Sequence, residues 1–293
     1  MPAPPSPGAP SEQTLAALGQ LPMSPSFQLS CLDAALAMAH SAGRVLSEGA
    51  FRRHDSENKS STTDLVTRFD RAAEEVICAA IRSRFPDHRI LAEESGAHGE
   101  DHAAPRWIID PLDGTTNFAH GLPLFSVSIA CEWEGQVRVG VVHAPALGWT
   151  FSAALGQGAH RNGVPISVSQ TDSIERALLV TGFPYDRKTS RENNFAQFLT
   201  LKRRAQGIRR LGSAALDLSL VAAGSLDGYW EMKLKPWDIA AGLLIAHEAG
   251  AIHSDWQGRP VELARGEVLC ANPQLHSELL SVLSTVEHGV LPL

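Results

Sequence analysis

The sequence is poor in the residues that build disulfide-rich or zinc-stabilised domains. Its 293 residues include only four cysteines, Cys31, Cys78, Cys131 and Cys270, and no two of them form a Cys-x-x-Cys pair. Cysteines so far apart are typical of reduced core positions in a cytosolic protein, and they argue against a zinc site or a disulfide framework. The twelve histidines likewise show no metal-ligand spacing.

The chain also lacks a long apolar run, a signal peptide and a positive net charge. No stretch approaches the length of a membrane span, and the N-terminus lacks the positive and then apolar profile of a secretory signal. The formal net charge is −7, which argues against nucleic acid or an anionic membrane as the main partner. An acidic protein can still bind phosphate esters where bound cations reverse the local sign of charge.

The length and the composition predict an extension followed by about two domains. Residues 1–25 contain seven prolines among small and polar residues, which predicts a disordered N-terminal extension. Hydrophobic residues make up 44% of the chain, enough for a sizeable core. No internal repeat is evident.

The two predicted domains differ in the order of their elements. Residues 26–170 are expected to form an α+β domain, with helices packed on an antiparallel sheet. Its predicted helices span 27–48 and 70–85, and its predicted strands lie near 89–92, 106–110, 125–133, 137–144 and 149–153. Residues 171–293 alternate strand with helix, which favours an α/β domain with a parallel or mixed sheet. Its predicted strands span 177–181, 207–210, 228–232, 251–254 and 267–271, and its predicted helices span 191–203, 213–223, 238–249 and 273–283.

The segment 107–118 is the most informative part of the sequence. Asp110 and Asp113 lie three apart, after an apolar strand-like run, and Pro111 stiffens the turn between them. Gly114 removes a Cβ where backbone approaches a ligand closely, and backbone N–H groups at a helix start favour an anion. Carboxylates beside an anion site are explained best by cations between them, and hard oxygen ligands favour Mg²⁺. The alternative interpretation is an ordinary Asp-Pro-x-Asp-Gly turn.

Two other segments carry carboxylates in comparable positions. Glu93 and Glu94 follow a short β-like run, and Asp238 stands near the start of an apolar helix. Taken alone, the glutamates would be a solvated strand end. Asp238 alone would be a helix N-cap, which contributes roughly 1 kcal/mol.

Together, these segments resemble the inositol monophosphatase family over roughly residues 30–285. The motifs appear in the order and with the gaps of that family. They are Lys59-Ser60-Ser61, Asp64-Leu65-Val66-Thr67 with Asp70, Ala92-Glu93-Glu94-Ser95, Asp110-Pro111-Leu112-Asp113-Gly114-Thr115-Thr116-Asn117-Phe118, Leu211-Gly212-Ser213-Ala214-Ala215, Tyr229-Trp230-Glu231-Met232 and Trp237-Asp238. One position departs from the pattern, because Ala92 stands where many relatives have glycine.

The resemblance implies a layered αβαβα sandwich and a Mg²⁺-dependent hydrolase of phosphate monoesters. A first Mg²⁺ is then expected on Glu93, Asp110 and the carbonyl of Leu112, and a second on Asp110, Asp113 and Asp238. A weaker third ion is expected near Glu93, with Lys59 on a loop beside it. Asp70 and Thr115 match the pair that orients and deprotonates the attacking water, which makes them catalytic candidates together with Glu93.

Substrate contacts are also implied by the resemblance. The backbone N–H groups of Gly114 and Thr115 are expected to meet the phosphate. The ring hydroxyls of an inositol are expected to meet five positions, which are Asp113, Gly212, Ser213, Ala214 and Glu231. The alternative for Glu231 is a solvated strand residue, and the basic cluster over 202–210 is more typical of a solvated helix end than of a second anion site.

Three functions follow from these observations. The first is an inositol-1-phosphatase of the bacterial type, and the second is a phosphatase of the same fold for histidinol phosphate, fructose 1,6-bisphosphate or 3′-phosphoadenosine 5′-phosphate. The third is a regulatory binding protein, whose signature would be a missing metal ligand, and none is missing. The resemblance further implies lithium sensitivity, a homodimer and a cytoplasmic location, with a small phosphate ester as the partner.

Overall fold

A computed structural model describes residues 24–54, 57–58, 65–99 and 104–286. Lys59, Asp64 and nearly all of the proline-rich extension lie outside these ranges, so the expectations for them stay predictions. The first described helix, α2 (Pro25–Gly49), begins two residues before the predicted start, because Ser24 caps it by accepting a hydrogen bond from the Phe27 N–H. None of the described helices combines the length and the apolar character needed to cross a membrane.

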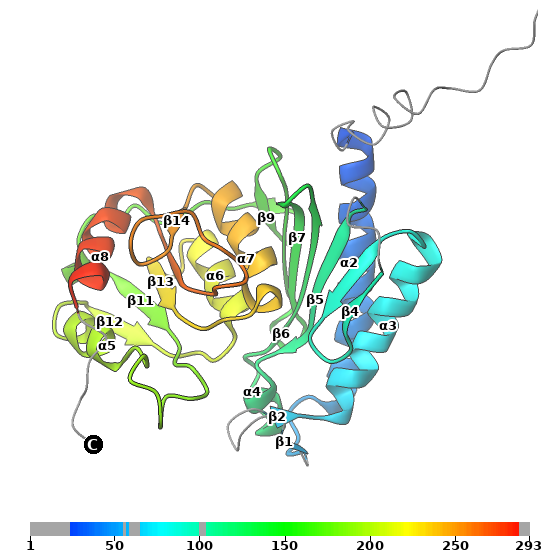
Figure 1. Ribbon diagram of the computed structural model, residues 1–293, viewed down its shortest axis with the longest axis horizontal. Coiled ribbons are helices and arrows are strands. Elements are labelled where there is room, and N and C mark those ends of the chain that lie inside the picture. The colour runs from blue at the N-terminus through cyan, green and yellow to red at the C-terminus, as the bar shows by residue number, and fades with distance from the viewer. Residues whose placement is uncertain (1–23, 55–56, 59–64, 100–103, 287–293) are drawn as a thin grey trace, which may run out of the picture.

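The larger sheet has eight strands and lies against α2 and α3 (Arg68–Arg84) (Figure 1). In spatial order its strands are β10 (Val164–Pro165), β9 (Ala159–Arg161), β8 (Trp149–Ala154), β7 (Gln136–Ala144), β6 (Ser126–Trp133), β5 (Arg106–Asp113), β3 (Arg89–Ala92) and β4 (Gly96–His98). The pairing is antiparallel except between β3 and β5, which are parallel. The prediction of an antiparallel sheet missed this pair, because the β3–β4 hairpin places β4 at the sheet edge and the chain returns on the other side of β3.

The smaller sheet is mixed, as predicted. Its five strands are, in spatial order, β12 (Gly207–Arg209), β11 (Leu178–Thr181), β13 (Gly228–Glu231), β15 (Val268–Ala271) and β14 (Ile252–Ser254). Strand β11 is parallel to β12 and β13, whereas β15 is antiparallel to both of its neighbours. A further pair, β1 (Glu57–Asn58) and β2 (Leu65–Val66), and two 3₁₀ turns, η1 (Pro145–Leu147) and η2 (Ile174–Arg176), complete the short elements.

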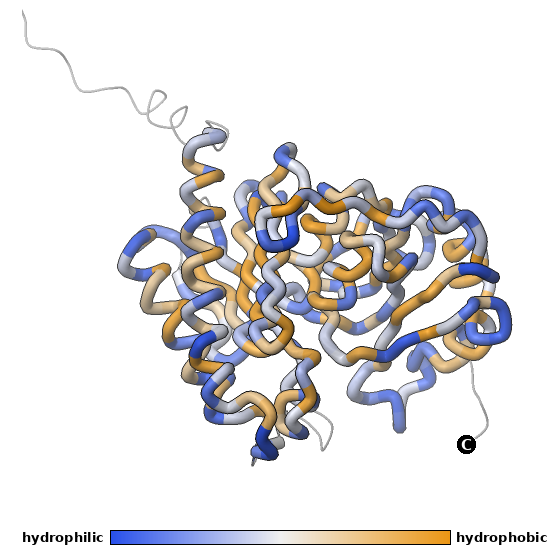
Figure 2. The backbone as a smooth tube through the Cα atoms, turned by 180° about the vertical axis from the view of Figure 1, so that it is seen from behind, coloured by the Kyte–Doolittle hydropathy of each residue, from blue (hydrophilic) through white to orange (hydrophobic). Residues whose placement is uncertain are grey.

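Helices and sheets alternate in five layers, which confirms the predicted sandwich. From one side of Figure 1 to the other the layers are α2 with α3, the larger sheet, α6 (Ala214–Ala222) with α7 (Pro236–Glu248), the smaller sheet, and α5 (Phe195–Lys202) with α8 (Pro273–Thr285). Three buried apolar clusters fill the spaces between layers, and the hydrophobic segments lie inside while hydrophilic turns lie outside (Figure 2).

The middle helices pack closely because apolar residues predominate on most of their faces. All nine residues of α6 are buried. At Gly140 on β7, an added Cβ would lie 2.8 Å from the carbonyl oxygen of Ala241 on α7, so glycine lets this helix approach the sheet. The two sheets divide the sequence between β10 and β11, and the domain boundary near residue 170 stays a prediction.

The helix predicted over 191–203 is shorter in the structure, because Asn194 cannot be part of it. Its backbone is left-handed, with φ 68°. Its buried side chain is fully used outside the helix: Nδ2 donates to Thr181 Oγ1 at 2.9 Å and to the Gly182 carbonyl at 2.7 Å, and Oδ1 accepts from Trp230 Nε1 at 2.7 Å. The helix therefore begins at Phe195.

Candidate active site

The strand β5 continues through the Asp-Pro-x-Asp segment instead of ending at Asp110. Asp110 pairs with Ser128 and Asp113 with Ser126, so the register shifts between them. Such a bulge accommodates Pro111, which cannot donate a ladder hydrogen bond. The Leu112 N–H donates to Asp110 Oδ1 at 2.9 Å. The bulge therefore places two buried carboxylates at one end of the larger sheet.

Asp113 connects the larger sheet to the N-terminus of α6. Its Oδ2 accepts hydrogen bonds from Ser213 Oγ at 2.6 Å and from the Ala215 N–H at 2.8 Å, and its Oδ1 accepts from the Ala214 N–H at 3.3 Å. A carboxylate at a helix N-terminus is favoured by the free N–H groups and the helix dipole. Ser213 and Ala214, predicted as substrate contacts, thus bind Asp113 here.

The turn after Asp113 also packs against the segment before α6. Gly114 has φ 97° and is the N-cap residue of α4 (Thr115–Ala119). An added Cβ on Gly114 would lie 2.9 Å from the Leu124 carbonyl oxygen and 3.2 Å from that of Gly212. Asn117 Nδ2 donates to the carbonyls of Leu124 and Leu211, at 2.6 and 2.7 Å. The predicted phosphate-binding turn and Gly212 are therefore neighbours.

The structure brings the two catalytic candidates Asp70 and Thr115 into a hydrogen bond. Thr115 Oγ1 lies 3.0 Å from Asp70 Oδ1 and 3.0 Å from the Leu112 carbonyl oxygen, with the hydroxyl as donor. Asp70 is fully buried near the start of α3, where Thr67 donates to Oδ2 from its N–H at 2.8 Å and from its hydroxyl at 2.7 Å. Burial raises the pKa of Asp70, and the hydrogen bonds from Thr67 and Thr115 oppose that rise.

Glu93 lies half-buried just beyond β3, in a turn that a second carboxylate holds. Its N–H donates to the Ile109 carbonyl at 3.1 Å. Glu74, buried on α3, accepts from the N–H groups of Glu94 and Ser95, both at 2.8 Å. Ala92 is buried in β3 and is not among the residues with positive φ, so the departure from the family's glycine causes no backbone strain.

Asp238 is the third residue of α7, not its N-cap. The predicted helix began at 238, but α7 begins at Pro236, a residue that suits the first turn because its missing N–H is not needed there. The half-buried side chain of Asp238 turns back and accepts a hydrogen bond from the Lys235 N–H at 2.7 Å. The N-cap interpretation of this residue is therefore wrong.

The carboxylates at this end of the larger sheet repel one another. Burial, the charges of Glu93, Asp113 and Asp238, and a hydrogen bond with the Glu93 carboxyl all raise the pKa of Asp110 well above its ordinary value. Burial raises the pKa of Asp113 to about 6, against the hydrogen bonds from Ser213 and Ala215. Burial and the charges of Asp113 and Glu93 raise the pKa of Asp238 well above its ordinary value.

This group of side chains fits divalent cations by its chemistry. Its donors are hard carboxylate oxygens, with the Leu112 carbonyl close to Asp110 in the chain, and these are the ligands that Mg²⁺ prefers. A cation would also remove the repulsion that raises their pKa values. Within the described part of the chain, however, no three His, Cys, Asp or Glu side chains are already drawn together around a point that could hold an ion. The Mg²⁺ sites stay a prediction.

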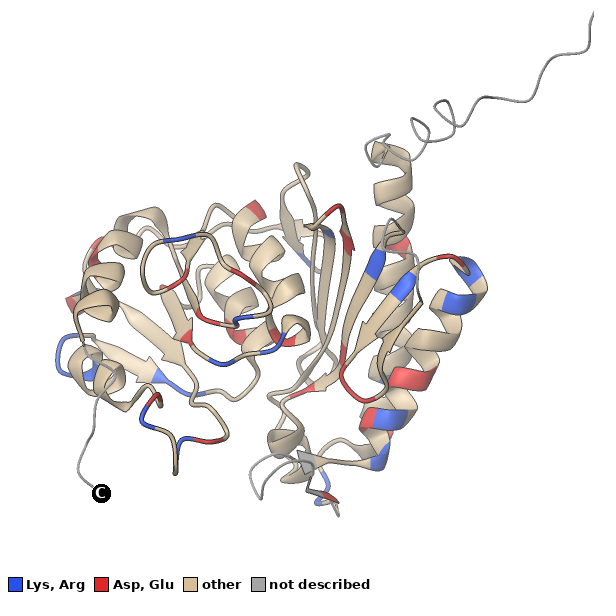
Figure 3. Ribbon diagram, in the orientation of Figure 1, with Lys and Arg blue, Asp and Glu red and all other residues tan. Residues whose placement is uncertain are grey.

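Glu231 belongs to a pocket between α6, β13 and the start of α7. Its Oε2 accepts from the Tyr229 hydroxyl at 2.9 Å, and burial raises its pKa to about 7. The pocket measures about 120 Å³, and its walls include Asp113, Gly212, Ser213, Ala214, Glu231 and Asp238. The structure thus brings together the predicted contacts to the ring hydroxyls from both halves of the sequence, whereas Gly114 and Thr115 are not among the residues that line the pocket. Acidic positions gather where β5, α6 and α7 meet (Figure 3).

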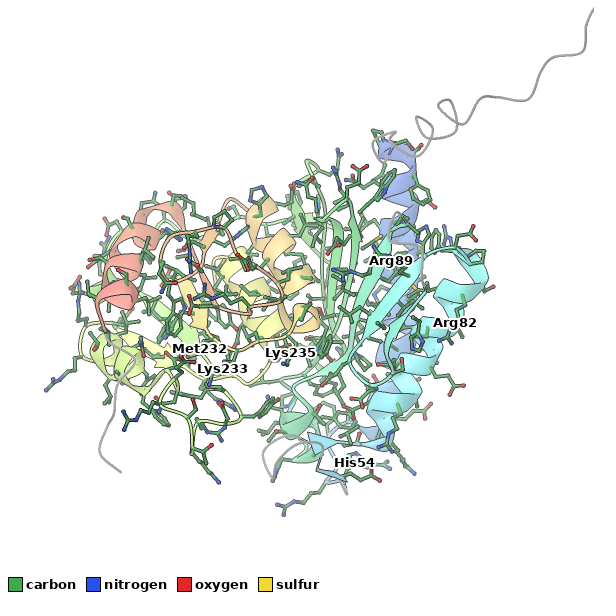
Figure 4. All side chains as sticks on the ribbon, in the orientation of Figure 1. His54, Arg82, Arg89, Met232, Lys233 and Lys235 are labelled. Carbon is green, nitrogen blue, oxygen red and sulfur yellow. The ribbon has the colours of Figure 1, made fainter. Side chains whose placement is uncertain are left out.

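Several residues around the site escaped the sequence analysis. Asp217 and Lys235 also line the pocket, as does Arg210 of the basic cluster that the sequence assigned to a solvated helix end. Met232, Lys233 and Lys235 lie along the segment that runs from the smaller sheet toward the larger one (Figure 4). Glu74 could have been noticed, because it lies four residues after Asp70 and hence on the same face of α3. Asp217 had a signal too, because it is the only charged residue of the predominantly apolar helix α6.

Comparisons with known proteins agree with this arrangement. The chain matches the Inositol monophosphatase family over residues 28–288. It is 48% identical over 228 residues to an inositol-1-monophosphatase of Synechocystis, covering 78% of this chain and 79% of the relative. It is 43% identical over 251 residues to the Nus factor SuhB of Pasteurella multocida, covering 85% and 94%. The inositol monophosphatase structure from Anabaena superposes with a TM-score of 0.81 at 43% identity, covering 88% of this chain and 96% of that one.

Neutralising Asp110 should abolish turnover and stabilise the metal-free protein. Asp110→Asn keeps the shape of the side chain but removes the charge that Glu93, Asp113 and Asp238 repel. We expect at least a hundredfold loss of phosphatase activity at saturating Mg²⁺, on the order of 3 kcal/mol of barrier, and a higher melting temperature in EDTA. Retention of more than a tenth of the wild-type activity would mean that Asp110 is not essential.

The stabilisation by Asp110→Asn should depend on pH. A carboxyl whose folded pKa is raised supports folding below its unfolded pKa, near 4, and loses that support as pH rises toward the folded pKa. The variant's gain in melting temperature over wild type in EDTA should therefore be large at about pH 7.5 and small at about pH 5. Because both proteins contain the same histidines, the effect of histidine titration cancels in the difference between their melting temperatures. A gain that does not change with pH would contradict charge repulsion as its cause.

Glu74 should act on metal affinity through the turn that carries Glu93. Glu74→Gln keeps one acceptor oxygen and loses the second, so one of the N–H groups of Glu94 and Ser95 is left without its carboxylate partner. We expect the Mg²⁺ concentration for half-maximal activity to rise by roughly tenfold, the effect known for residues that orient metal ligands, while kcat at saturating Mg²⁺ changes little. An equal fall of kcat at every Mg²⁺ concentration would show that Glu74 does not act through the metal.

Proposed function

The chain belongs to the inositol monophosphatase family and is a phosphatase of that family, and on this premise we propose that it hydrolyses inositol 1-phosphate to myo-inositol and phosphate with Mg²⁺ as its cofactor. The observation that carries the proposal is the position of Asp113. Its carboxylate joins the acidic end of β5 to the N-terminus of α6. A group of carboxylates thereby opens onto the pocket that contains Glu231.

Five residues would hold the metal ions. Glu93, Asp110 and the Leu112 carbonyl would bind the first, and Asp110, Asp113 and Asp238 the second, with Asp110 shared. A third, weaker ion near Glu93 and Lys59 belongs to the same proposal. Bound Mg²⁺ would neutralise phosphoryl oxygens, lower the pKa of water and stabilise the leaving alkoxide. The raised pKa values of Asp110 and Asp238 support the assignment, because a cation would favour the charged forms of both.

Thr115 and Asp70 would orient the attacking water and take up its proton. When the Thr115 hydroxyl donates to Asp70 Oδ1, its oxygen lone pairs are free to accept a hydrogen bond from a water. Asp70 is held in place by two hydrogen bonds from Thr67, and a carboxyl with a raised pKa is a better base near neutral pH than an ordinary aspartate. The N–H groups of Gly114 and Thr115 would meet the phosphate.

Glu231 would recognise the alcohol. The Tyr229 hydroxyl donates a hydrogen bond to one of its oxygens and holds it in place. The carboxyl group also packs against Gly182: a Cβ added to this glycine would lie only 2.1 Å from Glu231 Oε1 and would displace the carboxyl group. A carboxylate accepts hydrogen bonds from neighbouring hydroxyl groups, which suits an inositol ring. Esters such as histidinol phosphate, fructose 1,6-bisphosphate and 3′-phosphoadenosine 5′-phosphate are the alternatives within the same mechanism.

A second candidate function comes from the relatives named Nus factor SuhB, which match most of the chain. A role as a Nus factor would exist beside phosphate hydrolysis and need not depend on it. Retention of such a role by Asp110→Asn, with turnover lost, would separate the two functions. The homodimer and the cytoplasmic location that the family resemblance implies stay predictions.

The direct test of the proposal is a panel of phosphate esters assayed with and without Mg²⁺. We expect inositol 1-phosphate to give the highest kcat/KM and EDTA to abolish release from every ester. Glu231→Gln should lower kcat/KM for inositol phosphate by about ten- to a hundredfold, as expected for losing a hydrogen bond between a charged group and a hydroxyl. Glycerol 2-phosphate, with fewer hydroxyls, should lose less. Equal losses of kcat/KM on both esters would mean that Glu231 supports the structure of the site and does not bind the hydroxyl groups of the inositol ring.

Lithium should inhibit uncompetitively with respect to the ester. Li⁺ is close to Mg²⁺ in size but carries half its charge, so at Asp110, Asp113 and Asp238 it would hold the product phosphate without supporting its release. The measurement is the initial rate as a function of LiCl and of ester, with NaCl as the control for ionic strength. Full activity at roughly tens of millimolar Li⁺ would refute lithium sensitivity and leave metal-assisted hydrolysis untouched.

A further inference from the structure

Asp217 is a buried carboxyl group whose hydrogen bonding the fold does not complete. It lies on α6 and is only 1% exposed. Its Oδ1 has no hydrogen-bond partner among the residues that the structure describes. A buried polar atom left unpaired costs free energy, so each such atom in a native protein calls for a partner from outside the fold, such as a water, an ion or a ligand.

The rest of α6 shows that this arrangement is particular to Asp217. The helix has one other polar residue, Ser219, which is fully buried and donates its hydroxyl to the Ala215 carbonyl at 2.8 Å. Ser219 is thus satisfied within the helix, as serines commonly are. Asp217 has no such local solution. Its backbone N–H is used, by donating to the Ser213 carbonyl at 2.9 Å, but its side chain is not.

The position of Asp217 points to the ligand of the pocket. Asp217 lies one helical turn beyond Ala214, and both line the same pocket as Glu231 and Arg210. Burial and the charges of Glu231 and Asp113 raise the pKa of Asp217 well above its ordinary value, and Arg210 opposes this. A carboxyl that keeps its proton both donates and accepts hydrogen bonds, as a hydroxyl group does.

Resting on the proposed function, we infer that Asp217 binds a hydroxyl group of the alcohol part of the ester, beside the hydroxyl bound by Glu231. Asp217 is then a specificity-determining residue. Two carboxyl groups from different elements, α6 and β13, require at least two hydroxyls at a fixed separation. The pocket should therefore select phosphate esters of rigid polyols over esters of simple alcohols, which leave one or both carboxyl groups unpaired.

The test compares Asp217→Leu and Asp217→Asn with wild type on inositol 1-phosphate and on 4-nitrophenyl phosphate, which carries no hydroxyl. Leucine has a similar size and no polar atom, whereas asparagine can still donate and accept. Asp217→Leu should raise KM for inositol phosphate by about tenfold or more, with kcat changed less than about threefold, and should leave the kinetics of 4-nitrophenyl phosphate within about twofold. Asp217→Asn should have a KM for inositol phosphate much closer to that of wild type than Asp217→Leu has.

Two controls separate recognition from structure. Ser219→Ala removes a buried polar group from the same helix outside the pocket, and it should leave both substrates unaffected. The melting temperature of Asp217→Leu should not fall, because the replaced oxygen has no partner within the fold to lose. A lower melting temperature with equal losses on both substrates would assign Asp217 a structural role and overturn the inference. An unchanged KM for inositol phosphate would overturn it as well.

The wild-type enzyme distinguishes this inference from the proposed function. If wild type hydrolyses neither ester with Mg²⁺, the proposed function fails and the inference fails with it. If wild type hydrolyses both esters and prefers inositol phosphate, but Asp217→Leu keeps that preference, the proposed function stands and only the role of Asp217 is refuted.

Discussion

The contact between Asp113 and the N-terminus of α6 is the interaction on which the site depends. Three hydrogen bonds tie the end of β5 to a helix from the other half of the sequence. They stabilise the charged form of a carboxyl that burial disfavours. Through this contact, the acidic end of the larger sheet and the pocket beside the smaller sheet share a wall, to which Asp238 also belongs. The predicted metal ligands and the predicted substrate contacts meet here because Asp113 belongs to both sets.

Repulsion among the carboxylates of this region opposes folding, and neighbouring parts of the structure hold these carboxylates in place against it. Burial raises the pKa values of Asp110, Asp113 and Asp238, and the charge of Glu93 adds to all three rises. Each nevertheless lies where backbone N–H groups or a rigid element holds it: the bulge of β5, the first turn of α7 and the turn that Glu74 binds. Negative charge held in place against repulsion is a useful arrangement for binding cations, because the free energy gained on binding includes the repulsion that disappears.

Most of the fold could be predicted from the sequence, because its helices and strands have clear apolar periods and end at glycine, proline or capping residues. The site motifs were also recognisable, since Asp110, Asp113, Glu93 and Asp238 each follow a strand or open a helix. The failures have local causes that periodicity does not encode. The parallel pairing of β3 with β5 depends on which side of β3 the chain returns, and the late start of α5 depends on the tertiary contacts of Asn194. Asp217 shows its unpaired oxygen only in three dimensions.

The central claim is that the carboxylates of β5, of α7 and of the turn after β3 hold divalent cations at the mouth of the Glu231 pocket. The most direct measurement is anomalous X-ray scattering from crystals of the wild-type protein grown with Mn²⁺ in place of Mg²⁺, since Mn²⁺ takes similar oxygen ligands and scatters anomalously. The account predicts at least two peaks, about 3.5–4 Å apart, with Asp110 between them. A single peak elsewhere, or none within reach of Asp110 at millimolar Mn²⁺, would contradict it.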